Sequence, residues 1–187
     1  MEGYKKIILF DKEGNEYDSM EGVVSYEAHM DKVEFTSVFG GDGGYEGFEG
    51  YYIVTDEGVS GDDITTEMVI DFFRSIKAQE MSEECNKAIE AGFDYNGDSF
   101  DYDQIAQNNL TSTMMSLFLD SSITEVYVKG RIAGDMMLTK DEFLALYRAS
   151  EEHKKTLRAK YTGIKDNLLN GDFESLEKLK SVTWDNS

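Results

Sequence analysis

Short apolar runs separated by turn residues dominate the first third of the chain. Residues 4–10 read Tyr-Lys-Lys-Ile-Ile-Leu-Phe, and residues 33–39 alternate apolar and polar side chains almost to their end. Such runs are typical of strands, and strict alternation indicates a strand with one buried face. Further strands are predicted at residues 16–20, 23–28 and 51–55. We therefore expect a small antiparallel β meander that forms an N-terminal domain over residues 1–62.

A glycine-rich segment interrupts these strands. Residues 40–50 hold six glycines in eleven positions, which predicts a flexible, exposed loop. The segment lacks the Gly-Lys-Ser/Thr ending of a phosphate-binding loop, and the neighbouring carboxylates would repel phosphate. Four aromatic residues lie in this loop and directly after it: Tyr45, Phe48, Tyr51 and Tyr52. Such residues usually pack within a sheet, but tyrosine also suits protein interfaces, so a partner interface stays open for all four.

Helical periodicity replaces the strand pattern after residue 63. The apolar spacing predicts a helix over residues 64–78. A second helix is predicted over residues 82–91, with Ser82 as its N-cap and Gly92 as its end. Residues 63–92 would then form a helical connector between the two halves of the chain.

The remaining residues, 93–187, should form a mostly helical module that contains one hairpin. Residues 93–100 are expected to turn at Asn96-Gly97, the dipeptide most typical of a tight hairpin. Asp103 can cap a helix over residues 104–119, and residues 123–128 are expected to be extended. The predicted inward face of that helix comprises Ile105, Leu110, Met114, Leu117 and Phe118. The whole pattern predicts an α+β fold.

A long helix is predicted over residues 140–169, because Thr139 and Glu142 form a capping box at its start. A short helical turn should follow at residues 174–179. The apolar stripe of the long helix is interrupted in the middle and continues at Leu157, Tyr161 and Ile164. This pattern fits a single amphipathic helix with one solvated turn. It also fits a helix that packs on its own domain first and on a partner chain through those last three residues.

Negative charge is concentrated in the N-terminal third. The chain has a net charge of −20, and residues 1–63 hold 16 acidic against 4 basic side chains. Phosphate backbones would be repelled, so nucleic-acid binding is not expected. A basic protein partner would suit this part, although the charge could serve solubility alone. No apolar run approaches the roughly 20 residues of a membrane helix, so no membrane partner is expected.

The candidate chemical motifs are all incomplete. Residues 94–99 offer oxygens at three positions of a calcium-binding EF-hand, but Ser99 stands where glycine is needed and Ile105 where glutamate is needed. A looser calcium site near Asp42 or near residues 62–63 stays open. The two histidines, at positions 29 and 153, lie in different halves, and no Gly-x-Ser-x-Gly motif occurs. Cys85, the single cysteine, suits a small packed apolar residue better than a nucleophile. We therefore predict no catalytic residues, no cofactor, no metal and no enzymatic activity.

A set of residues in the second half carries a family resemblance. In order, these are Gly92-Phe93-Asp94-Tyr95-Asn96-Gly97 with Phe100, Asp103, Gln107-Asn108, Leu138-Thr139, Glu142-Phe143, Leu146, Ala149, His153 and Leu176-Glu177. Over residues 88–180 the chain resembles a domain of unknown function that recurs at the C-terminal end of bacteriophage tail and tail-fibre-associated proteins. Residues 125–128 depart from that family, which often carries tryptophan in this stretch.

The resemblance implies a non-enzymatic structural protein of a phage particle. It would lie in the tail, baseplate or fibre network, assemble in the host cytoplasm and remain in the virion. Its partners would be other phage structural proteins, in a homo- or hetero-oligomer. A tail or fibre assembly chaperone that is absent from the finished virion is the alternative. A host-directed inhibitor that mimics nucleic acid is a third reading, which the nearly neutral C-terminal half disfavours.

Overall fold

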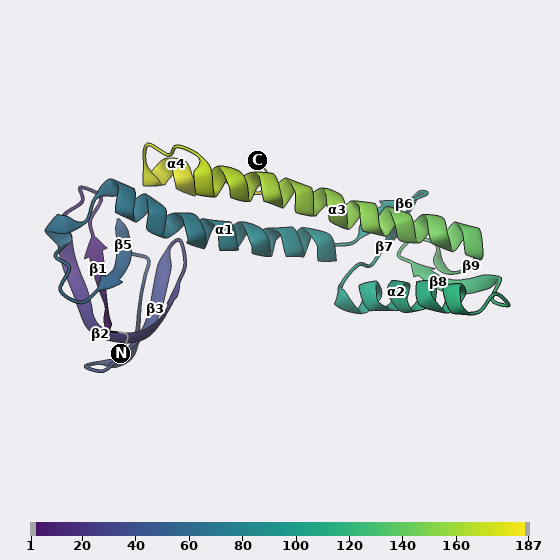
Figure 1. Cartoon of the computed structure of the whole chain (residues 1–187), viewed down its shortest axis with the longest axis horizontal. Coiled ribbons are helices and arrows are strands. Elements are labelled where there is room, and N and C mark those ends of the chain that lie inside the picture. The colour runs from purple at the N-terminus through teal and green to yellow at the C-terminus, as the bar shows by residue number, and fades with distance from the viewer. Residues whose placement is uncertain (1–2, 186–187) are drawn as a thin grey trace. The chain divides into compact units, whose positions relative to one another are not determined.

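The N-terminal part of the protein is a five-stranded antiparallel sheet. In the computed structural model, which describes residues 3–185, the strand order is β4-β3-β2-β1-β5. Figure 1 labels β1, β2, β3 and β5 of this sheet. The strands are β1 (Lys5–Phe10), β2 (Glu16–Ala28), β3 (Lys32–Ser37), β4 (Gly41–Glu46) and β5 (Tyr51–Asp56). The predicted antiparallel sheet is confirmed, but it is not a simple meander, since β5 returns to pair with β1.

Two strand predictions were wrong in detail. Residues 16–20 and 23–28 form one strand, because Gly22, with a φ of +67°, and a register shift between Val23 and Ser25 bend β2 without ending it. The predicted glycine-rich loop contains strand β4, which pairs with β3 without interruption from Gly41 to Glu46. Glycine lowers strand propensity, but pairing with β3 outweighs that preference here.

The sheet packs on the first half of a long helix. Ile8, Phe10 and Ile53 are buried together, and Ile64 and Phe72 lie against them. The ring of Tyr52 meets the rings of Phe72 and Phe73 edge to face. Burial of these large apolar side chains is the main source of stability for this part.

The helices and hairpins follow the sheet. A 3-10 turn, η1 (Gly61–Asp63), precedes α1 (Thr66–Glu90), and the later elements are β6 (Phe93–Tyr95), β7 (Asp98–Phe100), α2 (Gln104–Leu119), β8 (Glu125–Gly130), β9 (Gly134–Thr139), α3 (Lys140–Asn170) and α4 (Leu176–Lys180). The two helices predicted over residues 64–91 are a single helix, because no glycine or proline separates them. The α+β class is confirmed. No helix among residues 3–185 is long and apolar enough to cross a membrane.

The C-terminal part has two hairpins where one was predicted. The hairpin of β6 and β7 turns at Asn96 and Gly97, both with positive φ, as expected. The second hairpin pairs β8 with β9 over six residues in each strand. Residues 123–128 were expected to be extended, and β8 covers most of them. Its methionine-rich partner strand β9 was not predicted, because its residues gave no clear strand signal.

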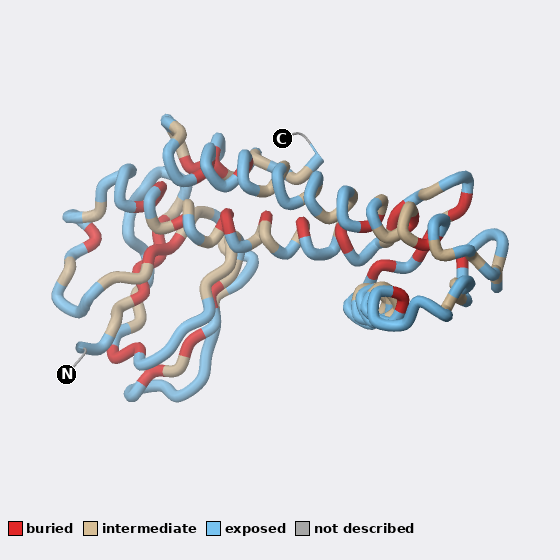
Figure 2. Tube along the Cα trace, turned by 45° about the vertical axis from the view of Figure 1, so that its right-hand side comes forward, coloured by how far each residue is buried: buried red, intermediate tan, exposed pale blue. Residues whose placement is uncertain are grey.

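The backbone divides into two compact units. The first unit comprises the residues up to Glu80 together with those from Lys165 onward, and the second comprises Met81–Ile164. Helices α1 and α3 each contribute residues to both units. Figure 2 shows where buried residues lie along the chain. In α2, nearly all residues are exposed or half-buried.

Candidate functional site

Helix α2 contains no charged residue. Its sixteen positions read QIAQNNLTSTMMSLFL, in a chain of which 30% is charged. Exposed helix faces normally carry charged side chains, and the central parts of protein interfaces are depleted of them. This composition makes α2 the strongest candidate for a partner-binding element.

Side-chain contacts within the second unit hold α2 in place. The Asp103 carboxylate accepts a hydrogen bond from the backbone N–H of Ala106 at 2.8 Å, which caps the helix N-terminus as predicted. At the other end, the Lys140 ammonium donates to the carbonyl oxygen of Leu117 at 2.9 Å. Leu117 is buried. The helix is therefore capped at both ends, and Lys140 and the buried Leu117 attach its C-terminal part to the rest of the unit.

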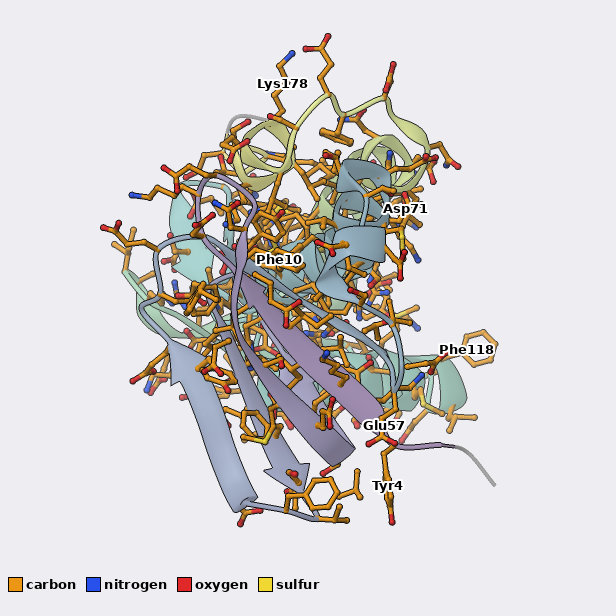
Figure 3. The ribbon with its side chains drawn as sticks, turned by 90° about the vertical axis from the view of Figure 1, so that its left-hand side faces the viewer. Tyr4, Phe10, Glu57, Asp71, Phe118 and Lys178 are labelled. Atoms are coloured by element: carbon orange, nitrogen blue, oxygen red, sulfur yellow. The ribbon has the colours of Figure 1, made fainter. Side chains whose placement is uncertain are left out.

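The opposite side of α2 is exposed and carries four large apolar side chains among uncharged polar ones. The exposed fractions are 84% for Phe118, 79% for Leu119, 70% for Ile105 and 59% for Met115. Phe118 projects away from the ribbon in Figure 3. We call Ile105, Met115, Phe118 and Leu119 the α2 surface. The prediction that Ile105 and Phe118 face inward was wrong, because both are largely exposed whereas Leu117 is buried. At 100° per residue, Ile105 and Phe118 lie about 120° and about 100° around the helix from Leu117.

The hairpin of β8 and β9 adds exposed apolar side chains to the same unit. Tyr127 and Met137 stand directly opposite each other across the two strands and are 60% and 59% exposed. A hydrogen bond with Asp135 raises the pKa of the Tyr127 hydroxyl above its ordinary value. Sequence reasoning missed both the α2 surface and this pair. The absence of charged residues over positions 104–119 is the sequence signal that could have revealed the α2 surface.

A second surface lies on the β2-β3-β4 side of the sheet in the first unit. Its residues border an open groove of about 740 Å³. The pairing register places Glu27 opposite Glu34, and Lys32 opposite Glu46, on one face. The Lys32 ammonium donates to Glu34 at 2.7 Å, and this hydrogen bond lowers the pKa of the Glu34 carboxyl. With Asp42 nearby, this face carries four carboxylates and one ammonium group, which we call the acidic face.

The aromatic residues predicted for a partner interface lie on the sheet and next to it. Tyr52 is fully buried, and its hydroxyl donates to the carbonyl oxygen of His29 at 2.6 Å. Phe48 packs edge to face on Tyr52, Tyr51 stacks on Phe10, and the ring of Tyr45 lies 5.5 Å from that of Phe35. All four therefore have intramolecular ring contacts, and a role in an interface stays a prediction for those that are partly exposed.

The three interface residues predicted on α3 have different environments. Ile164 is buried, whereas Leu157 and Tyr161 are half-buried. The Cys85 thiol lies 3.6 Å from the carbonyl oxygen of Leu157, and burial raises the pKa of that thiol. This part of α3 therefore packs partly within the protein, and its contact with another chain stays a prediction.

The acidic residues considered as metal ligands do not form a metal site, and Asp98 instead accepts hydrogen bonds from the backbone. Among residues 3–185, no group of three or more histidine, cysteine, aspartate or glutamate side chains could hold a metal ion. Asp98, from the calcium-like segment, accepts hydrogen bonds from the backbone N–H groups of Ser99, Ile132 and Ala133. Burial works to raise the pKa of Asp98, but these three donors outweigh it and hold the pKa below its usual value.

The side chain of His153 lies against two aromatic rings of the second unit. The ring centroids of Phe93 and Tyr102 are each 6.0 Å from that of His153. Its Nε2 atom is buried without a hydrogen-bond partner among the described residues. The imidazole therefore contributes mainly ring packing at this position.

Comparison with known proteins identifies one family. No curated protein and no solved structure matches the chain. Residues 73–181 match a domain of unknown function, DUF4376, and this match includes the α2 surface and both C-terminal hairpins. Because the match spans more than half of the chain, the protein belongs to the DUF4376 family.

Proposed function

We propose that this protein is a non-enzymatic structural component of a bacteriophage particle. It acts in the tail, baseplate or fibre network through protein–protein contacts, with other phage structural proteins as its partners. The assignment to a phage rests on the sequence resemblance of residues 88–180. The mode of action rests on the α2 surface.

The observation that carries this proposal is the uncharged, exposed side of α2. Apolar side chains are common on protein surfaces, but a contiguous exposed set indicates an interaction site. Phe118, Leu119 and Met115 lie within a single turn and are each more than half exposed. Methionine and aromatic residues are enriched in interfaces. The lack of charge on this helix removes the desolvation cost that charged side chains would add on binding.

Particle composition tests the proposed function. We would quantify this chain by mass spectrometry in purified particles, relative to the major capsid protein. A fixed copy number per particle is the expected result for a structural component. Its absence from finished particles, together with abundance in the infected lysate, would refute the structural role and support the assembly chaperone instead.

A pair of variants connects the α2 surface to this function. Phe118→Asp places a charge on the α2 surface and should lower the amount of the chain in particles about tenfold or more, as expected for an interface anchor. Since Phe118 is 84% exposed, folding should be preserved. Ser121→Asp is the matched control, because it adds the same charge at an exposed position just beyond α2. Equal incorporation of both variants would show that the α2 surface is not the docking site.

A further inference from the structure

Strand β4 forms an open edge of the N-terminal sheet. It is the terminal strand in the order and, among residues 3–185, pairs with β3 alone. Five of its six residues are exposed, and Tyr45 is half-buried. In an antiparallel pair, every second residue directs both its N–H and its C=O away from the partner strand. The outer side of β4 therefore presents backbone donors and acceptors that another strand could use.

This edge lacks several of the features that usually block strand addition, and the only charges on β4 are the carboxylates of Asp42 and Glu46. Natural edge strands are protected by lysine, proline, bulges or short length. Residues 41–46 contain neither lysine nor proline, and the register with β3 shows no shift. Three of the six residues are glycine. Gly43 leaves room for the Phe35 ring, which lies 3.0 Å from where a Cβ atom at position 43 would be. Few side chains therefore obstruct an approach to the backbone of β4.

The charge beside this edge defines the partner that fits it. On the acidic face, Glu46 and Asp42 belong to β4 itself, and Glu34 belongs to the adjacent strand. The only ammonium group of that face, on Lys32, already hydrogen-bonds Glu34. The opposite face of the same strands carries the adjacent rings of Phe35 and Tyr45. Because side chains alternate between faces along a strand, an incoming strand would meet carboxylates on one side and the half-buried ring of Tyr45 on the other.

We propose that β4 binds an extended segment of another protein as a sixth strand. The segment alternates basic and apolar residues, so that lysine or arginine side chains pair with the acidic face and apolar side chains contact the half-buried ring of Tyr45. A second copy of this chain is a poor occupant, because β4 paired with β4 would bring Asp42 and Glu46 of both copies together. This inference deepens the proposed function and rests on its premise that the protein works through protein contacts.

A synthetic peptide tests the proposal on the full-length protein. The probe is a blocked, fluorescein-labelled peptide of alternating lysine and valine, long enough to span β4, with binding followed by fluorescence anisotropy. The control peptide has the same sequence with N-methyl groups on alternate amides, which preserves its charge but removes one side of its backbone hydrogen bonding. We expect the N-methyl peptide to bind about tenfold or more weakly than the parent peptide. Equal binding would mean simple attraction to an acidic protein and would overturn the proposal.

Two charge variants locate the binding site. Glu46→Lys reverses a charge on β4 and adds an edge lysine, and it should weaken peptide binding about tenfold or more. Glu13→Lys changes the net charge equally in the exposed turn between β1 and β2, and it should have little effect. Equal loss in both variants would assign the effect to net charge and contradict the proposal. A dimer in analytical ultracentrifugation that Glu46→Lys dissociates would identify a second copy as the occupant and also overturn it.

These results separate the two proposals. The peptide experiment concerns β4 in the first unit, whereas the Phe118→Asp experiment concerns α2 in the second. Failure of strand addition with continued dependence on Phe118 would leave the structural role intact. Absence of the chain from particles, together with intact peptide binding, would refute the structural role and leave strand addition at β4 intact.

Discussion

Replacing Tyr52 with phenylalanine should destabilise the N-terminal unit by removing one hydroxyl group. Tyr52 lies on β5 and is fully buried. Its hydroxyl donates to the carbonyl oxygen of His29 at 2.6 Å and lies 3.1 Å from that of Lys32. Both carbonyls flank the turn between β2 and β3, so this contact joins an edge strand to a hairpin that does not pair with it.

The size of the stability loss depends on which contacts of Tyr52 the phenylalanine keeps and which acceptor it leaves without a donor. The phenylalanine ring would keep the edge-to-face contacts with Phe72 and Phe73, so no cavity forms. The carbonyl of His29 would lose its hydroxyl donor in a partly buried environment, whereas that of Lys32 still accepts from the N–H of His29. A lost hydrogen bond with one acceptor left unsatisfied costs about 1–2 kcal/mol. We therefore expect Tyr52→Phe to lower the free energy of unfolding by about that amount.

Urea denaturation measures this change directly. The single tryptophan, Trp184, belongs to the same unit as the sheet, so its fluorescence reports on unfolding of that unit. The slope of free energy against urea should stay constant, because the surface exposed on unfolding is unchanged. Tyr51→Phe is the control on the same strand, where the half-buried ring stacks on Phe10, and it should change stability by less than about 0.5 kcal/mol. If Tyr52→Phe cost no more than this control, the hydroxyl contact would not stabilise the sheet.

The same residue should affect stability at alkaline pH. Burial raises the pKa of the Tyr52 hydroxyl well above its ordinary value of 10.0. Above pH 10 the unfolded chain loses this proton while the folded protein keeps it, so stability falls as pH rises. Tyr52→Phe lacks this group and should lose less stability between pH 9 and pH 11, a range set around the ordinary tyrosine pKa of about 10. An identical alkaline decline in both proteins would contradict this assignment.

Three further substitutions, one of them on α3, test the stability of the second unit. Gly163→Ala lies on α3 with nothing within 4 Å of the added methyl group, and thermal denaturation should show a gain of about 0.5–1 kcal/mol. Gly130→Ala would place a Cβ atom 1.8 Å from an Asp98 carboxylate oxygen, and hydrogen exchange of the second unit should show a loss of about 1–3 kcal/mol. Asp98→Asn should lower stability at neutral pH. Because the pKa of Asp98 is lowered in the folded protein, its contribution is present above pH 3.8 and lost below, so circular dichroism should show a shallower acid decline for Asp98→Asn.

The features that sequence predicted well are those fixed by local chemistry. Asp103 caps α2 at the expected position, and Thr139 and Glu142 form the expected reciprocal contacts at the start of α3. Asn96 and Gly97 adopt the positive φ angles that their turn requires. In each case the interacting groups, or the turn residues themselves, lie within three positions of one another in the sequence. Such signals need no knowledge of the rest of the fold.

The features that sequence missed depend on distant partners. Residues 41–46 become a strand only because β3 is beside them, and their glycine content argues against that conformation when read alone. The orientation of α2 was predicted from apolar residues in general, but its inner side is set by contacts such as that of Lys140 with Leu117. Ile105 and Phe118 were placed inward on the assumption that large apolar residues are buried. Their exposure is what identifies a candidate interface.

The two candidate surfaces have opposite chemical character, and this difference determines what each can bind. The α2 surface has no charge to desolvate, so its binding should depend on apolar contact and be nearly insensitive to salt. The acidic face beside β4 attracts a basic segment through exposed carboxylates, so its binding should weaken as ionic strength rises. Because the surfaces lie in different units and share no residue, the effects of Phe118→Asp and Glu46→Lys on partner binding should add. A protein with two such independent surfaces could join a partner with an apolar surface to one with a basic segment, as the proposed structural role requires.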